Sequence, residues 1–135
     1  MNILGYQFPE IREARSFDAN WLMIQIKVNQ SNGYWQKNDP ALLTNEVEEL
    51  IGWLHELANN SCKVDCLSFT EPNLVFQNMG SHGEYIKMRI HFDLEFRNPM
   101  LNNKEDCNMD CILSREVLLS LCFDLEEELQ YYPSR

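Results

Sequence analysis

The sequence predicts an α+β fold, a mainly antiparallel β-sheet with two helices packed on one face. Several segments alternate apolar and polar residues with the period of two that places successive side chains on opposite faces of a strand. Two other segments carry apolar residues three and four apart, which forms one stripe along a helix. The segments run as strands, a helix, strands and a final helix. This order is typical of an α+β fold.

Three strands are expected before the first helix, beginning with a short one at residues 2–8. Residues 21–28 alternate most cleanly in this region. Their buried face consists of Leu22, Ile24, Ile26 and Val28. Residues 29–33 are rich in Asn, Ser and Gly, which tolerate left-handed backbone and predict a turn. Residues 34–43 then return as an antiparallel partner, which bends at Pro40.

Residues 44–60 predict the first helix. Thr44 or Asn45 can cap its N-terminus with a side-chain oxygen. Three glutamates follow in the first turn, where the helix dipole favours negative charge. The apolar stripe consists of Val47, Leu50, Ile51, Leu54, Leu57 and Ala58. We expect this stripe to pack on the buried face of the sheet.

The stretch "LSFTEPNLVF", residues 67–76, joins two further predicted strands at 63–69 and 73–78. Its apolar residues lie on odd positions before Pro72 and on even positions after it, so one unbroken strand would turn half of them outward. Proline has no N–H and favours a bulge or corner. We therefore interpret the stretch as shaping the sheet and not as catalytic, with Glu71 turned outward or hydrogen-bonded.

A turn at residues 79–83 leads into the strongest predicted strand, residues 84–98. Its apolar face consists of Ile86, Met88, Ile90, Phe92, Leu94 and Phe96. The intervening residues are polar, which indicates a sheet with one buried face and one face in water. A loop at residues 99–108 and a short strand at 109–113 follow.

Residues 114–132 predict the second helix, capped by Ser114 and closed by Pro133. Its apolar stripe consists of Val117, Leu118, Leu121, Cys122, Leu125 and Leu129. We expect both helices to cover the same face of the sheet.

The length, composition and net charge of the chain limit the functions that it can have. A chain of 135 residues with 44% hydrophobic residues predicts a single domain, residues 1–135, with a real core. No apolar run approaches the roughly 20 residues of a membrane span, and the first residues lack a signal-peptide pattern, so we expect a cytoplasmic protein. The net charge of −10 repels nucleic-acid phosphates and anionic lipid, which argues against nucleic acid and membrane as partners. It attracts a basic partner.

The five cysteines favour neither a disulfide framework nor a zinc site. Cys62 and Cys66 are four apart, as are Cys107 and Cys111, whereas zinc knuckles and redox motifs use a spacing of three. We interpret the cysteines as reduced side chains that behave as small hydrophobes, and we expect no cofactor.

One cluster could support catalysis. His91, Asp93 and Glu95 lie on the polar face of the strongest predicted strand and could bind a divalent metal or transfer protons. Three ligands on one strand spread over about 13 Å, which suits a single ion poorly. The sequence shows no nucleophile elbow and no glycine-rich phosphate loop. We therefore predict that the protein is not an enzyme, with a small metal-dependent enzyme as the alternative.

The outer faces of the two predicted helices form the best candidate for a partner-binding site. Opposite the second stripe lie Glu116, Phe123 and Glu127. Opposite the first stripe lie Glu49 and Glu56, with Trp53 on the flank. Charged residues around aromatic side chains are typical of protein-binding surfaces. The alternative is an ordinary solvated helix surface.

Five stretches resemble, in the same order, the bacterial WapI-like immunity proteins, over roughly residues 4–99. They are "GYQFPE", "DANWLMI", "DPALLTNEVEELIGWL", "LSFTEPNLVF" and "MRIHFDLEFRNP". The resemblance implies a cytoplasmic antidote that binds the C-terminal toxin domain of a polymorphic toxin, a domain similar to tRNA-cleaving nucleases. A nuclease of this kind carries a basic groove for phosphates, so the expected partner is a basic protein. The sequence leaves a monomer or a homodimer open, since an exposed sheet edge or Phe123 could support a dimer. A housekeeping ligand-binding α+β domain stays open as a further alternative.

Overall fold

The computed structural model describes residues 1–12, 16–31 and 33–135. In these residues seven strands form two antiparallel sheets, one in the order β1-β2-β3 and one in the order β4-β5-β6-β7. The strands are β1 (Asn2–Tyr6), β2 (Trp21–Gln30), β3 (Gly33–Leu43), β4 (Cys66–Ser68), β5 (Leu74–His82), β6 (Tyr85–Phe92) and β7 (Asn108–Ser114). The helices are α1 (Thr44–Ala58) and α2 (Arg115–Leu129), with short 3-10 helices at Asp18–Asn20 and Leu94–Phe96. The predicted α+β fold is confirmed.

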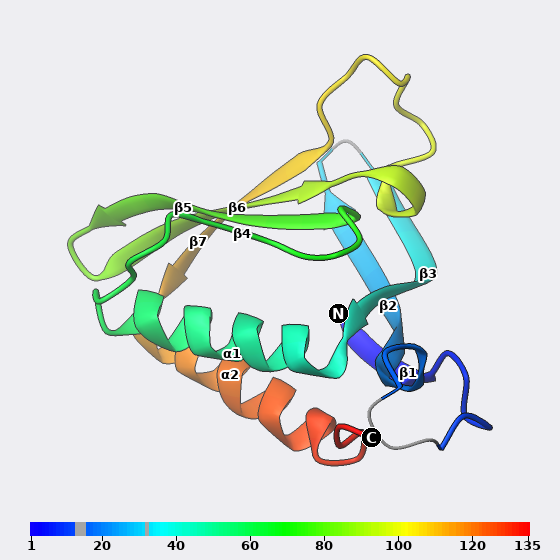
Figure 1. The fold of residues 1–135 in the computed structure, drawn as a ribbon. Helices are drawn as coiled ribbons and strands as arrows, with labels where there is room; N and C mark the ends of the chain where they lie inside the picture. The colour runs from blue at the N-terminus through cyan, green and yellow to red at the C-terminus, as the bar shows by residue number, and fades with distance from the viewer. Residues whose placement is uncertain (13–15, 32) are drawn as a thin grey trace.

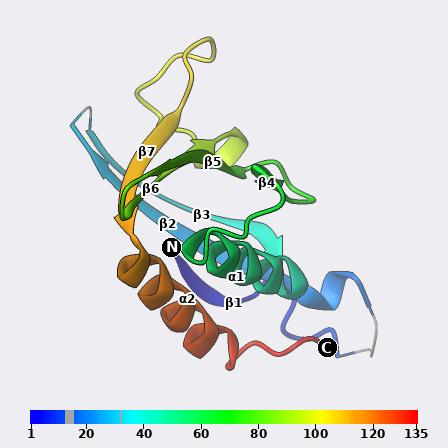
Figure 2. The same cartoon turned by 90° about the vertical axis from the view of Figure 1, so that its left-hand side faces the viewer.

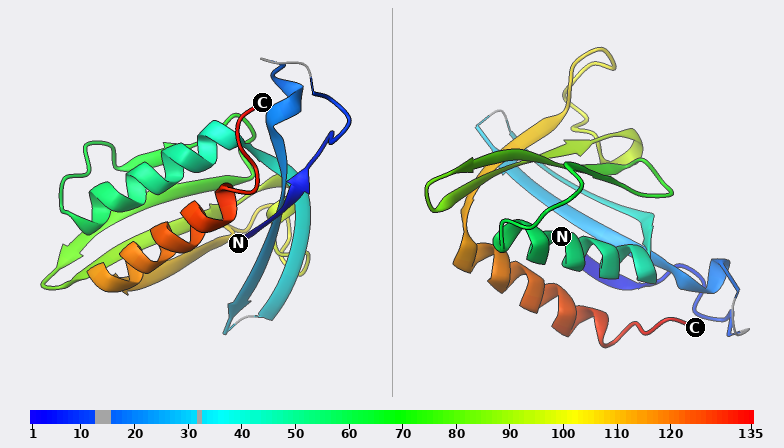
Figure 3. Two further views of the ribbon diagram at one scale, coloured as in Figure 1. Left: turned by 90° about the horizontal axis from the view of Figure 1, so that it is seen from below. Right: turned by 60° about the vertical axis from the view of Figure 1, so that its left-hand side comes forward.

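Helix α1 lies along one face of the four-stranded sheet, and α2 runs beside α1 in the opposite direction (Figure 1 and Figure 3). The three-stranded sheet crosses this layered part of the molecule (Figure 2). Buried side chains from both sheets and both helices belong to one hydrophobic cluster. The two helices therefore share a core with all of the strand layers.

The three-stranded sheet follows the predicted pattern. The four apolar residues of the β2 face, Leu22, Ile24, Ile26 and Val28, are all buried. β3 pairs antiparallel with β2, and beside Pro40 the register shifts but the strand does not end. Pro40 is tolerated because β3 is an edge strand, where one ladder hydrogen bond can be missing. The strand therefore continues to Leu43, directly before α1.

Helix α1 buries its whole predicted stripe, but the predicted cap is wrong. The N-cap residue is Leu43, and neither Thr44 nor Asn45 caps the helix. The Glu46 carboxylate instead reaches back and accepts the N–H of Leu43 at 2.9 Å. Thr44 lies inside the first turn, where its hydroxyl donates to the Asn20 carbonyl at 3.3 Å. The Thr44 hydroxyl is therefore engaged in a tertiary hydrogen bond and does not cap the helix.

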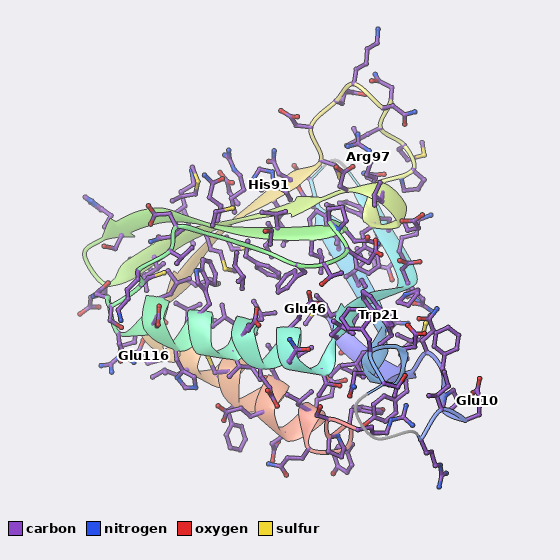
Figure 4. All side chains as sticks on the ribbon, in the orientation of Figure 1. Glu10, Trp21, Glu46, His91, Arg97 and Glu116 are labelled. Carbon is purple, nitrogen blue, oxygen red and sulfur yellow. The ribbon has the colours of Figure 1, made fainter. Side chains whose placement is uncertain are left out.

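The interrupted stretch around Pro72 is the connection between two paired strands, so the predicted corner is confirmed. Leu67 of β4 stands opposite Phe76 of β5, which places the two on the same face although their positions differ in parity. The second oxygen of Glu46 accepts the N–H of Thr70 at 2.6 Å. One buried carboxylate thus ties the start of α1 to this corner, and Figure 4 shows Glu46 between the helix and the strands.

The turn that was predicted at residues 79–83 lies a few residues later in the structure. β5 continues to His82, with a register shift between Asn78 and Ser81, and the hairpin turns at Gly83 and Glu84. Gly83 has φ of +60°, a conformation that glycine adopts without a steric penalty.

The strongest predicted strand also ends earlier than its alternation indicates. β6 stops at Phe92, and the chain turns into the 3-10 helix at Leu94–Phe96. Asp93 donates its N–H to the Asn73 carbonyl at 2.9 Å, and its side chain accepts the N–H of Leu94. Leu94 is consequently 50% exposed, whereas Phe96 is fully buried. The prediction that both share one strand face is wrong because these contacts redirect the backbone.

Helix α2 is capped as predicted, with the Ser114 hydroxyl accepting the N–H of Val117 at 3.4 Å. Its buried face is narrower than the predicted stripe. Leu118 and Cys122 are fully buried, but Val117 is 45% and Leu121 38% exposed. The reason is that α2 packs mainly along α1 at the border of the molecule (Figure 3).

Trp35 joins the two sheets. Its ring packs edge-to-face on Phe92 of β6, with 5.6 Å between the centroids. Its indole N–H donates to the Phe96 carbonyl at 3.0 Å. This buried contact satisfies the polar atom of the tryptophan and fixes β3 against the segment that follows β6.

We expect the substitution Glu46→Ala to lower the free energy of unfolding by about 3 kcal/mol, because it leaves two backbone N–H groups without their acceptor. The matched control is Glu48→Ala in the same helical turn, an exposed residue whose loss should change stability by less than about 0.5 kcal/mol. Urea unfolding measures both. Equal effects would show that the Glu46 contacts do not stabilise the fold.

Asp39 gives a prediction about pH. Burial and the nearby Glu95 carboxylate raise the pKa of Asp39, against a hydrogen bond from the Asn73 amide at 2.9 Å. A raised native pKa means that the unfolded state loses its proton first, so ionised Asp39 destabilises the fold at neutral pH.

Asp39→Asn should therefore raise the free energy of unfolding at pH 7 by a few tenths of a kcal/mol, since a partly exposed carboxylate is screened by solvent. The gain should shrink as the pH falls towards the ordinary Asp value of 3.8, where the native protein already carries the proton. Urea unfolding at several pH values checks this. A gain that stays constant with pH would contradict the assignment.

Candidate protein-binding surface

The two helices present their exposed faces side by side. The Cys122 thiol of α2 lies 3.8 Å from the Ile51 carbonyl oxygen of α1. His55 Nε2 lies 3.1 Å from Glu126 Oε1, and the Arg115 guanidinium donates to Asn59 beyond the end of α1. These contacts run along both helices, so residues on the solvent side of α1 adjoin residues on the solvent side of α2 (Figure 3).

This pair of helices is strongly acidic. Helix α1 carries four glutamates, α2 carries four glutamates and Asp124, and Arg115 is the one Lys or Arg in either helix. We use the name acidic helix face for six glutamates of the two helices together with one aromatic residue. It consists of Glu48, Glu49, Glu56, Glu116, Phe123, Glu126 and Glu127. Its field has a single sign, which attracts a basic macromolecule.

Phe123 is the aromatic residue of this face, and its ring is 57% exposed. Glu127 lies one helical turn after it, Glu116 two turns before it, and Glu126 three residues on. On a helix these spacings place the side chains next to one another. A large apolar side chain among carboxylates is therefore held in water with little cover from the rest of the protein.

The structure brings most of the predicted site residues to this face. Glu49, Glu116 and Glu127 are exposed, and Glu56 is half-buried beside the N–H of Lys63 at 3.5 Å. Figure 4 shows Glu116 at the start of α2, away from the strands.

Trp53 is not on the acidic helix face. It is only 5% exposed, its indole N–H donates to the Val64 carbonyl at 2.8 Å, and its ring lies 6.3 Å from that of Phe76. The ring belongs to the core because Phe76 of β5 and the chain before β4 cover that side of α1. Trp53 therefore offers no contact to a partner in this conformation.

The outer side of the four-stranded sheet has a different electrostatic character. Arg89 of β6 makes two contacts with the Asp110 carboxylate, at 2.6 and 3.0 Å, and Lys87 adds a third at 2.9 Å. These cations hold the pKa of Asp110 well below its usual range. The charges there are paired with each other, whereas those of the acidic helix face, apart from His55 with Glu126, have no ion-pair partner among the described residues.

His91, Asp93 and Glu95 do not form the cluster that motivated a metal-dependent enzyme. His91 contacts Gln77 at 3.2 Å, Asp93 caps the 3-10 helix, and Glu95 lies 3.5 Å from the Asn73 amide. The chain leaves the strand after Phe92, so the three side chains do not share a face. In residues 1–12, 16–31 and 33–135, no three His, Cys, Asp or Glu side chains gather as a set of metal ligands.

The five cysteines are all free thiols. Cys107 and Cys122 are buried, and burial raises the pKa of the Cys122 thiol. These two behave as small core residues, as interpreted for all five. Cys66, in contrast, is exposed, and Cys62 and Cys111 are only partly buried.

Sequence reasoning missed a cavity of about 340 Å³ between the two sheets and the two helices. Its apolar walls come from β2, α1, β5, β6, β7 and α2, among them Ile26, Leu54, Phe76, Met88 and Leu121. Beside it lies an open hollow lined by Asn2, Asp124, Glu127, Glu128, Gln130, Tyr131 and Tyr132. No local pattern could have predicted the cavity, because its lining is assembled from segments that are far apart in the chain.

Comparison with known proteins places the chain in a family. No curated protein and no solved structure matches it. No helix in the described part of the chain is long and apolar enough to cross a bilayer. A family model for the immunity protein WapI-like family matches residues 1–133, a range that runs past residue 99 and includes β7 and α2. The chain therefore belongs to the WapI-like family of immunity proteins.

Proposed function

We propose that this chain neutralises the C-terminal toxin domain of a polymorphic toxin in the cytoplasm of the producing cell, and that the acidic helix face is the interface. Family membership supports the role, and the one-sided charge of the two helices supports the site. The observation that carries the site is Phe123, an exposed aromatic ring surrounded by carboxylates.

A nuclease is the toxin class that this surface fits. A nuclease active site is a groove of Lys and Arg that binds phosphates. Carboxylates on a rigid helix pair can occupy such a groove in place of phosphates and block it without any chemistry. Opposite charges also steer the two proteins together, so association is fast and slows as salt is added.

Charge alone does not make a tight complex. The strongest contacts in protein interfaces are buried aromatic or Arg side chains surrounded by weaker polar contacts. Phe123 has the exposure for this role, and its carboxylate neighbours supply the polar rim. The sheet face is the weaker candidate because Asp110 is already neutralised by Arg89 and Lys87.

Co-expression with a candidate toxin domain, taken from a gene next to this one, tests the function. We expect the two chains to co-purify as a stable complex and the host cell to survive a toxin domain that is otherwise lethal. Light scattering then establishes whether one or two copies of this chain bind. Failure to form a complex at micromolar concentrations would contradict the proposed function.

Glu116→Lys combined with Glu127→Lys tests the charged part of the interface. We expect the association rate at low salt to fall by about tenfold and its salt dependence to weaken, because the steering field is reduced. Stopped-flow mixing measures the rate. Glu84→Lys, in the exposed β5–β6 turn, is the control for net charge, and an equal loss in that variant would place the interface elsewhere.

Phe123→Ala tests the aromatic part. We expect binding to weaken by about 2 kcal/mol, roughly 30-fold, mainly through faster dissociation. Tyr85→Ala is a matched control, since Tyr85 is 56% exposed but lies on β6. Surface plasmon resonance compares the dissociation rates, and identical rates for both variants would exclude Phe123 from the interface.

A further inference from the structure

We propose that the apolar cavity and the hollow beside it form one receptor, which takes an apolar side chain of the toxin domain together with an adjacent Lys or Arg. The inference rests on the proposed function and adds the chemistry of the partner at a specific place. It also extends the interface from the outer face of α2 to the side of α2 that faces β1 and β2.

The cavity is suited to an apolar group. Its volume is about 340 Å³, and most of its walls are Ile, Val, Leu, Phe and Met side chains from both sheets and both helices. It is also lined by Asn2, Lys27, Asp124 and Glu128. Folded interiors are packed closely, with few voids larger than a water molecule. This space opens to solvent beside Leu121 and Met1, and its volume lies in the range of clefts that accept small apolar groups. It therefore has the character of a binding pocket.

The cavity is reached from α2 and the first strand. Leu121 and Met1 both line it, and each is 38% exposed, so they belong to the cavity and to the surface at once. Deeper lining residues such as Leu54 and Met88 are buried. An incoming side chain would pass Leu121 and come to rest between α1 and the four-stranded sheet.

The neighbouring hollow is suited to a cation. Asp124, Glu127 and Glu128 line it together with Tyr131 and Tyr132, and no Lys or Arg does so among the described residues. Glu128 already accepts the N–H of Ile3 at 2.6 Å. Asp124 and Glu127 have no ion-pair partner in the part of the chain that the structure describes. Carboxylates and aromatic faces together bind guanidinium and ammonium groups.

The two spaces adjoin each other and the acidic helix face. Asn2, Asp124 and Glu128 line both the cavity and the hollow. Glu127 belongs to the hollow and to the acidic helix face. This continuity favours one macromolecular partner over a separate small ligand, and the net acidity of the hollow requires that the partner be basic there. Two cations lie near these spaces, Lys27 and the Met1 ammonium, which interacts with Glu128. Both residues line the cavity and neither lines the hollow, which keeps three carboxylates.

Leu121→Trp tests the cavity, because a larger ring at its mouth obstructs entry. We expect affinity for the co-expressed toxin domain to fall at least about tenfold. Val117→Trp is the matched control: Val117 lies one turn earlier on α2, is 45% exposed and does not line the cavity. Circular dichroism and thermal unfolding of both variants establish that they fold, and calorimetry measures the affinity.

A second pair of variants changes the charge of a side chain and leaves its size nearly unchanged. Asp124→Asn should weaken binding several-fold and reduce its salt dependence, whereas Asp106→Asn, an exposed residue of the loop before β7, should leave both unchanged.

The outcomes separate the two proposals. Wild-type affinity in Leu121→Trp and Asp124→Asn, with an intact wild-type complex, would overturn the receptor and leave the proposed function standing. Absence of binding by the wild-type protein would overturn both. A small apolar molecule retained by the purified protein in native mass spectrometry, with toxin affinity unchanged in Leu121→Trp, would assign the cavity to that molecule and overturn the receptor.

Discussion

Helix α1 has to bury side chains around most of its circumference, because the four-stranded sheet, α2 and the end of β3 all pack against it. Trp53 contacts Phe76 of the sheet, Ile51 meets Cys122 of α2, and the helix begins directly after the buried Leu43. Such a helix leaves only a narrow exposed strip. Helix α2 has neighbours on fewer sides, so it supplies most of the helical surface that can meet a partner.

Two buried polar contacts hold this arrangement together. The Glu46 carboxylate joins the start of α1 to the corner at Thr70, and the Trp35 indole joins β3 to the segment after β6. Buried polar groups cost free energy unless they are paired, so each contact favours one relative placement of the elements it joins. A scaffold that is already ordered loses little entropy when it binds a partner, which would favour the inhibitory role proposed above.

Charged side chains are distributed unevenly between the sheet and the helices. Across the outer side of the four-stranded sheet Asp110 is matched by two cations, whereas the helices concentrate carboxylates with a single arginine. A paired charge contributes little to long-range attraction, but a group of like charges produces a field that extends to an approaching protein. The self-repulsion of these carboxylates is tolerable because they lie in water, where like charges are screened.

The periodicity of apolar residues was sufficient to predict those elements whose structure depends on residues close together in the chain. The alternation of residues 21–28 and the stripe of α1 predicted both elements, and helical spacing predicted that Glu49, Glu116, Phe123 and Glu127 face outward. It failed at Leu94, because Asn73 redirects the backbone, and at Trp53, because the Val64 carbonyl and Phe76 draw the ring inward.

The sequence by itself determined the antiparallel strands, the two helices and the acidity of their outer faces, since these follow from residues a few positions apart. Only the tertiary structure decided that the strands divide between two sheets, that the faces of α1 and α2 lie side by side, and that a cavity opens beside α2. Each of these depends on contacts between residues that are distant in the chain, and no local pattern records them.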